Sequence, residues 1–339
     1  KEVIFFLSIR KLLLKRYGSE VSGMKIKEIG SFFVGGKIVS LKGLPSYEAV
    51  VVAGGPKRLI DPNGDFMTGQ MYVQFVKQEE PCCEYPVLMW HGGGCTGVTW
   101  ESTPDGRPGW QMDFLQAGYD VYTSDGMERG RSSWSRFPEI YESEPIFRVL
   151  KDYWEFFRIG PHYSMEKSER VAYENTQFPI EYFEDFCKQG VPRWTTNGEA
   201  THKAYDEYLE KVDPCILIAH SQGSEFAAMA TLRNPEKVKA LILLEPTFAP
   251  AISEENLAKI AHIPHLYIWG DYIDSVPLWV EYKKRPQEYF EAQKNQEIDA
   301  TWIDLPEIGI KGNDHFLMVG KNSDEIAEIV KKWLKERGL

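Results

Sequence analysis

The chain is predicted to fold as an α/β protein with a mostly parallel central sheet flanked by helices. From Tyr85 onward, short apolar strand-like stretches such as Val238–Leu244 alternate with helix-like stretches. Strands that are apolar throughout are typical of a parallel sheet that is covered on both faces. Residues 28–80 instead alternate in polarity around turn signals at 34–36 and 61–64, which predicts antiparallel strands ahead of the parallel sheet.

One large insertion interrupts the parallel pattern. After the strand-like stretch Tyr119–Tyr122, about ninety residues pass before the next apolar strand, far more than one crossover helix needs. We therefore predict a core made of residues 28–135 and 210–339, with a helical cap (lid) inserted at residues 136–209. Residues 1–27 form an N-terminal extension, and apolar residues at helical spacing predict that it is helical.

Composition and charge restrict the class of protein. The 339 residues are 43% hydrophobic and carry a net charge of −11, which supports one sizeable core and argues against nucleic acid as a partner. The five cysteines show no zinc-binding or disulfide pattern. This pattern favours a cytoplasmic location over secretion. We also expect no metal and no cofactor. No apolar run reaches the roughly 18 residues of a membrane span, although the N-terminal segment is compatible with lying on a membrane surface.

The most informative local motif surrounds Ser221. An apolar strand-like stretch, Ile216–His220, breaks there into small and polar residues, and a helix-like stretch follows. This pattern indicates a nucleophile elbow, a strained turn that exposes the serine hydroxyl between a strand and a helix. Ala219 stands in place of the first glycine of the usual G-x-S-x-G pattern, and Gly223 supplies the second. Ser221 is therefore the predicted nucleophile.

A glycine-rich loop follows the strand-like stretch Tyr85–Trp90. Backbone N–H groups that carry no bulky side chain can approach a developing oxyanion closely, so this loop suits an oxyanion hole. We predict the N–H groups of Gly93 and Gln222 as its donors, with Gly94 as a second candidate. The loop lacks the spacing of a phosphate-binding motif.

A serine needs a histidine to take its proton and later return it to the leaving group. His315 lies in a loop that follows the strand-like stretch Thr301–Leu305 and precedes a C-terminal helix. It comes after the nucleophile and after the candidate acids in the chain, as in one common order of the three catalytic groups. His315 is therefore the predicted base.

Two places in the sequence could supply the acid that orients this histidine. Glu245 ends the apolar stretch Val238–Leu244, where a carboxylate is costly unless it is paired. Asp271 and Asp274 follow the next strand-like stretch, although an aspartate there is also common as a cap. The residues alone leave the two places evenly matched.

The insertion is rich in aromatic residues, and we expect it to roof an apolar pocket for the acyl or alcohol part of a substrate. Four of these residues are candidates for lining the pocket: Trp154, Phe157, Phe178 and Trp194. Most aromatic residues of the insertion are expected to form its own core.

The elbow, the glycine loop and the late histidine together resemble the α/β-hydrolase superfamily. Further motifs along the chain resemble a bacterial esterase group typified by esterase 713: Gly30–Gly36, Gln70–Val73, Thr99–Gly106, Gly130–Ser132, Thr176–Pro179, Glu245-Pro246 and Gly312–His315. The acid of that group is a glutamate after the sixth strand, so the resemblance implies Glu245. That group also has two adjacent cysteines after His-Gly, where this chain has Gly93 and Gly94, so its vicinal disulfide does not carry over.

These observations predict a serine hydrolase that cleaves a small-molecule carboxylic ester through an acyl-enzyme. A lactonase or an acyltransferase would use the same three residues. A non-enzymatic small-molecule receptor of the same fold is a further alternative. The sequence leaves open whether the protein is a homodimer and which acyl chain it prefers.

Overall fold

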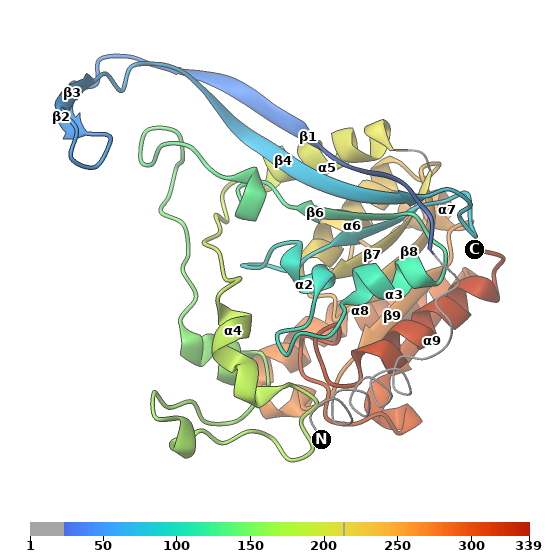
Figure 1. Ribbon diagram of the computed structural model, residues 1–339. Helices are drawn as coiled ribbons and strands as arrows, with labels where there is room; N and C mark the ends of the chain where they lie inside the picture. The colour runs from blue at the N-terminus through green and yellow to red at the C-terminus, as the bar shows by residue number, and fades with distance from the viewer. Residues whose placement is uncertain (1–23, 213) are drawn as a thin grey trace, which may run out of the picture.

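The computed structural model describes residues 24–212 and 214–339 (Figure 1). The predicted N-terminal helix lies almost entirely outside the described residues, and Ile26 already begins the first strand. An eight-stranded sheet forms the centre, in the order β1-β4-β6-β5-β7-β8-β9-β10, and β2 and β3 form a separate two-stranded sheet.

The central sheet is antiparallel at one edge and parallel elsewhere. β1 (Ile26–Leu41) pairs with β4 (Gly64–Gln78), and β4 pairs with β6 (Val121–Asp125), both in the antiparallel sense. The parallel part consists of β6 with β5 (Val87–Trp90), β7 (Cys215–His220), β8 (Val238–Leu244), β9 (His265–Trp269) and β10 (Ala300–Asp304). This arrangement confirms the predicted parallel sheet with antiparallel N-terminal strands.

Helices cover both faces of the sheet (Figure 1). On one face, α3 (Trp110–Gln116) and α9 (Ser323–Lys335) pack against each other. The other face carries α5 (Gly198–Lys211), α6 (Gln222–Arg233) and α7 (Glu254–Ile260), while α8 (Pro277–Asn295) packs against β10. The shorter helical turns are α2 (Val98–Glu101), α4 (Phe183–Cys187), η1 (Gly130–Ser132), η5 (Ile273–Ser275) and η6 (Leu305–Ile308).

Successive residues of the parallel strands face opposite halves of the core. In β7, Ile216 and Ile218 belong to the hydrophobic cluster under α3 and α9, whereas Leu217 and Ala219 belong to the cluster under α5, α6 and α7. All four are fully buried. Because both faces of such strands are covered, polar chemistry is confined to the edge where the strands end at their carboxyl termini.

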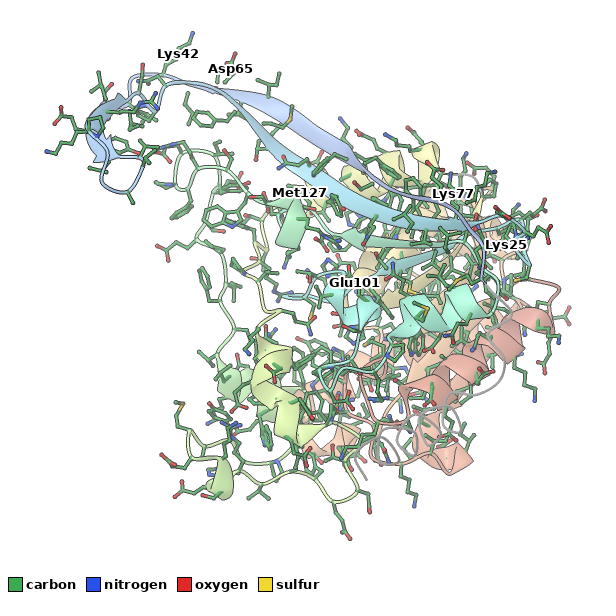
Figure 2. The ribbon with its side chains drawn as sticks, in the orientation of Figure 1. Lys25, Lys42, Asp65, Lys77, Glu101 and Met127 are labelled. Carbon is green, nitrogen blue, oxygen red and sulfur yellow. The ribbon has the colours of Figure 1, made fainter. Side chains whose placement is uncertain are left out.

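The antiparallel strands form a long hairpin that extends beyond the rest of the sheet. In Figure 2, Lys25 and Lys77 mark one end of it, and Lys42 and Asp65 lie at the other. At the distant tip, β2 (Tyr47–Val50) pairs with β3 (Lys57–Ile60).

The two predicted turns of this region have different outcomes. The turn at 61–64 is confirmed, because it connects β3 to β4. The prediction of a turn at 34–36 is wrong, because β1 continues through these residues in register with β4. Gly35 has a φ of 66° and a Cβ there would lie 2.8 Å from Ala204 Cβ, so the glycine permits close packing of the strand on α5.

The interval predicted as the cap, residues 136–209, has little regular structure before α5. It contains a π-helical turn, η2 (Asp152–Phe156), two short 3₁₀ turns, η3 (Lys167–Glu169) and η4 (Ile180–Tyr182), and α4. Six buried aromatic residues ahead of α5 join the same cluster as α3 and α9: Tyr153, Trp154, Phe157, Phe178, Phe183 and Phe186. The predicted boundary at 209 falls inside α5, which contacts β1 and β4.

Candidate active site

Ser221 occupies a sharp turn between the end of β7 and the start of α6. Its backbone has φ 52° and ψ −122°. This conformation is energetically unfavourable for any residue that has a side chain. The turn is held by a hydrogen bond from the Ser221 N–H to the Leu244 carbonyl, at 3.0 Å. A Cβ on Gly223 would lie 2.5 Å from the His91 carbonyl oxygen, so α6 can approach β5 this closely only with glycine there.

His315 contacts the carboxylate of Glu245. The distance from His315 Nδ1 to Glu245 Oε2 is 2.9 Å, and both side chains are fully buried. Glu245 follows β8 and has a positive φ of 48°, and its Oε1 accepts a hydrogen bond of 2.7 Å from the Gly270 N–H. The structure therefore brings together the glutamate and the histidine that the sequence places 70 residues apart.

The alternative acids make different contacts. Asp271 accepts hydrogen bonds from the backbone N–H groups of Gly312 and Tyr272, at 3.0 and 2.8 Å. Asp271 therefore stabilises the backbone of the loop that leads to His315 and makes no hydrogen bond to the imidazole. Asp274 lies in the short turn η5 and has no hydrogen bond through its carboxylate to a described residue.

Arg158 is a part of this site that the sequence did not indicate. Its Nη2 donates to both carboxylate oxygens of Glu245, at 2.6 and 2.7 Å, and its Nε donates to the Asp271 carbonyl at 3.0 Å. The side chain is 0% exposed, and its guanidinium lies 4.7 Å from the ring centroid of Trp279. Its one signal in the sequence is a charged residue that directly follows two phenylalanines, which does not identify its partner.

Burial, together with the charges of Arg158 and Arg148, holds the pKa of His315 well below its ordinary value of 6.5. The imidazole is therefore neutral at neutral pH. Its Nε2 is buried and has no hydrogen-bond partner among the described residues, so the structure shows no hydrogen bond from Ser221 to it.

His220, the residue before the elbow serine, supports the histidine loop. The distance from His220 Nε2 to the His315 carbonyl oxygen is 2.8 Å, and the two rings are 4.4 Å apart between centroids. Burial and the adjacent His315 hold the pKa of His220 well below 6.5. A neutral His220 therefore links the elbow to the loop that carries His315.

The glycine loop lies beside the elbow. A Cβ on Gly92 would lie 3.0 Å from Ser221 Cβ, and one on Gly93 would lie 2.8 Å from Gln222 Oε1. The N–H groups of Gly93 and Gly94 donate to no described acceptor, and Gln222, as the first residue of α6, has no acceptor within its own helix. All three predicted oxyanion donors are therefore available, and Gly93 lies against Gln222.

Of the four aromatic residues predicted to line the pocket, Phe157 contacts the candidate site. Its ring stacks on His315 at 5.0 Å between centroids, with an interplanar angle of 8°. Trp154 and Phe178 pack on Phe183, and Trp194 packs on Tyr141. All four predicted residues are buried, and the latter three lie in aromatic clusters of the cap.

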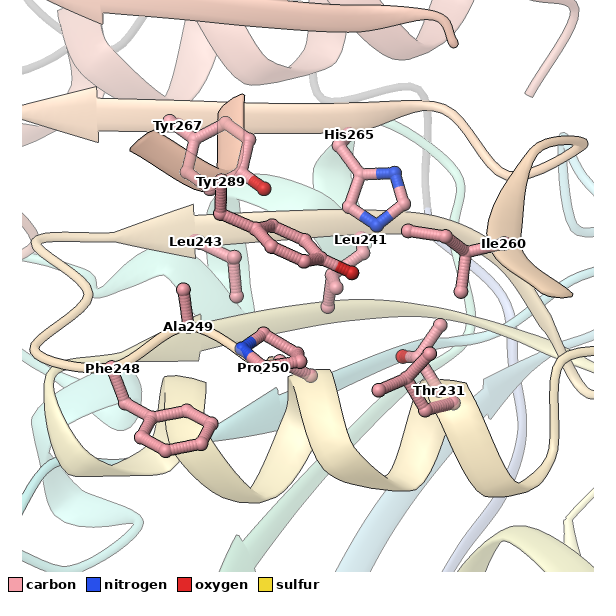
Figure 3. Close-up of a pocket in the computed structure, with 12 residues that line it drawn as sticks. Thr231, Leu241, Leu243, Phe248, Ala249, Pro250, Ile260, His265, Tyr267 and Tyr289 are labelled. Atoms are coloured by element: carbon pink, nitrogen blue, oxygen red, sulfur yellow. The ribbon is translucent and has the colours of Figure 1, made fainter. Parts of the chain in front are cut away.

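A small cavity of about 10 Å³ lies away from this site, on the side of the sheet that carries α6 (Figure 3). Leu241, Leu243, Tyr267 and Tyr289 are among its lining residues, and it includes none of the predicted site residues.

Among the helices that the structure describes, none is long and apolar enough to span a membrane.

Comparison with known proteins agrees with the geometry. Residues 209–272 match a family model described as the alpha/beta hydrolase fold. A solved bacterial esterase is similar over 94% of this chain and 98% of its own, with a TM-score of 0.80 and 27% identity. The chain has the α/β-hydrolase fold.

A curated relative is similar over most of its length. The chain is 26% identical to the probable secreted lipase phiG of a fungal species (strain ATCC 74256), over 81% of this chain and 88% of the relative. The family-model match covers β7, the elbow, β8 and β9, which are the elements that carry Ser221 and Glu245.

Gly223→Ala is expected to destabilise the protein, because the new methyl group would lie against the carbonyl oxygens of His91 and Trp90. We expect a loss of about 1–3 kcal/mol, measured as a lower free energy of unfolding in urea. Gly198→Ala is the matched control, because a Cβ at this position in α5 has no neighbour within 4 Å. Equal stability of the two variants would show that the elbow has room for a side chain at 223.

Arg158→Gln is expected to move the acid limb of the kcat/KM profile to higher pH. His315 accepts a proton only when neutral, so activity falls as pH drops through its depressed pKa, which lies below 6.5. Removing the cation raises that pKa. Arg158→Lys keeps the charge and should keep the wild-type limb. A folded Arg158→Gln protein with an unmoved limb would contradict this account, and thermal unfolding of both variants serves as the folding check.

Proposed function

We propose that this protein is a serine hydrolase of carboxylic esters, with Ser221 as nucleophile, His315 as general base and Glu245 as the orienting acid. The observation that carries the proposal is the 2.9 Å contact between His315 Nδ1 and Glu245 Oε2, on a loop that contacts the elbow through His220. Ester hydrolysis of the α/β-hydrolase type is supported by the similarity to an esterase and a lipase.

In the proposed acylation step, Ser221 Oγ attacks the ester carbonyl carbon while its proton passes to His315 Nε2. The ester C–O bond then breaks, and the proton moves from His315 to the departing alkoxide. Water attacks the resulting acyl-enzyme by the same route and releases the acid. The proposed step requires Ser221 Oγ to come within hydrogen-bond distance of His315 Nε2, and such contacts often tighten only in the complex with substrate.

The contacts of Glu245 explain how it would serve His315. A carboxylate at Nδ1 fixes the tautomer that leaves Nε2 free to accept a proton, and it stabilises the imidazolium that forms. This buried carboxylate also accepts two charged hydrogen bonds from Arg158 and one from the Gly270 N–H. The acid is thus held in place by both the cap and the core.

The oxyanion of the tetrahedral intermediate would be held by the N–H groups of Gly93 and Gln222. Both are free of other acceptors, and removing such a donor typically costs about 10²–10³ in kcat. Phe157, which stacks on His315, is the cap residue that we propose for the substrate-facing wall.

The preference for a cytoplasmic location stays a prediction, and the similar fungal protein is described as secreted.

Ser221→Ala is expected to abolish turnover of p-nitrophenyl acetate while the fold is kept, because alanine cannot form the acyl-enzyme. A fluorophosphonate probe should label Ser221 in the native protein, as identified by mass spectrometry. A folded wild-type protein with neither turnover nor labelling would contradict the enzymatic proposal and favour a receptor of the same fold.

Glu245→Gln is expected to lower kcat by about 10²–10⁴, because the imidazole loses the charge that orients it. Asp271→Asn is the matched comparison, since Asp271 bonds to backbone N–H groups and does not contact the imidazole. The assignment is wrong if steady-state kinetics shows the larger loss of kcat in Asp271→Asn.

A further inference from the structure

Three arginine side chains converge on the glycine loop, and the proposed mechanism uses none of them. Arg129 follows β6, and Arg148 and Arg193 belong to the cap; we call these three residues the arginine cluster. The charges of all three act on the buried thiol of Cys95, which follows Gly94. Arg193 lies against the loop that carries the proposed oxyanion donors, and Arg129 and Arg148 are near enough for their charges to reach Cys95.

Arg193 is held over Gly93 by its backbone. It forms a two-way hydrogen-bonded bridge with Ile146, at 2.7 and 3.1 Å, and the nearby Val191 N–H donates to the Gly94 carbonyl at 3.0 Å. A Cβ on Gly93 would lie only 2.7 Å from Arg193 Nη1 and 3.5 Å from Cζ. The guanidinium thus lies directly against the residue whose N–H is proposed to bind the oxyanion.

Two members of the cluster, Arg129 and Arg193, lack the acidic partners that arginines with buried nitrogens usually have. Arg193 Nε and Arg129 Nη1 are buried without a hydrogen-bond partner among residues 24–212 and 214–339. Neither residue has a carboxylate of the described chain within 4.0 Å, and Arg148 reaches only Asp152, at 3.7 Å. Glu225 is close enough to influence Arg193 but makes no ion pair with it.

This arrangement is unfavourable as long as the site holds no anion. Arg129 is 6% exposed, and burial followed by the charge of Arg193 lowers its pKa to about 10. Burial and the charge of Arg148 also lower the pKa of Arg193. An arginine side chain is a cation at neutral pH, so like charges lie close together at this site. A bound anion would offset both the repulsion and the unmet hydrogen bonds.

We infer that Arg193, with Arg129 and Arg148 nearby, forms an anion-binding subsite next to the oxyanion hole, and that the preferred esters carry a carboxylate. A guanidinium binds a carboxylate through paired charged hydrogen bonds, so it suits recognition of a planar anion. This inference rests on the proposed esterase function. It makes Arg193 a residue that determines specificity and predicts the chemical class of the substrate.

Matched ester pairs test this inference, because a carboxylate and an isopropyl group have similar shapes. Monomethyl glutarate is compared with methyl 5-methylhexanoate, which places the charge on the acyl part. 3-Acetoxypropanoate is compared with 3-methylbutyl acetate, which places it on the alcohol part. Turnover is followed by pH-stat titration, so that no chromophore is required.

In at least one pair, wild-type protein should have the higher kcat/KM for the charged ester. Arg193→Gln should lower that value about tenfold to a hundredfold, as expected for lost charged hydrogen bonds, and change the neutral isostere by less than about threefold. Arg58→Gln is the control for net charge, because Arg58 is exposed on β3, far along the hairpin. It should leave both values unchanged.

The outcomes separate this inference from the proposed function. Failure of the wild-type protein to hydrolyse any of the esters would refute the proposed function. Hydrolysis with the neutral isostere equal or preferred in both pairs would refute the subsite alone. An equal loss for charged and neutral esters in Arg193→Gln would also refute it, since Arg193 would then act on the oxyanion or on the loop itself.

A measurement on the wild-type protein keeps the test independent of folding of the variant. Glutarate should competitively inhibit hydrolysis of 3-methylbutyl acetate, whereas 1,5-pentanediol at the same concentration should not. Equal inhibition by the two compounds, or none by either, would overturn the anion subsite.

Discussion

The site depends on one buried chain of charged hydrogen bonds, from Arg158 through Glu245 to His315. A carboxylate at the end of an apolar strand would be protonated or displaced if it were unpaired. Here it accepts two hydrogen bonds from Arg158, one from the Gly270 N–H and one from the histidine. Removing one partner of such a buried pair typically costs about 3–5 kcal/mol, so this network holds the catalytic geometry and the local fold together.

The same network joins the cap to the core of the molecule. Arg158 comes from the cap, Glu245 from β8, and His315 from the loop before α9, and Phe157 next to Arg158 stacks on the His315 ring. Most of the buried cap aromatics ahead of α5 share one hydrophobic cluster with α3 and α9. The first part of the insertion is therefore built into the core of the molecule. A rigid cap would also hold Arg193 over Gly93 and Arg148 over the ring of Phe157, where their charges would act on a bound substrate.

Sequence reasoning succeeded where the signal is local. Uniformly apolar strands predicted the parallel sheet, and the small residues around Ser221 predicted the elbow, whose tight packing explains them. It failed at Gly35, because a glycine needed for close packing on α5 looks like a glycine needed for a turn. It could not find the Arg158–Glu245 pair, which joins residues 87 apart through an irregular segment without periodicity. The placement of Arg193 over Gly93 depends in the same way on an isolated backbone bridge with Ile146.

A crystal structure of the protein after reaction with diethyl p-nitrophenyl phosphate would test the central claim most directly. The account predicts a phosphorus atom bonded to Ser221 Oγ and a phosphoryl oxygen about 2.7–3.1 Å from the N–H groups of Gly93 and Gln222. It also predicts that His315 Nε2 faces the adduct while Nδ1 keeps its contact with Glu245. A phosphorylated residue other than Ser221, or a His315 that contacts Asp271 or Asp274 in place of Glu245, would contradict it.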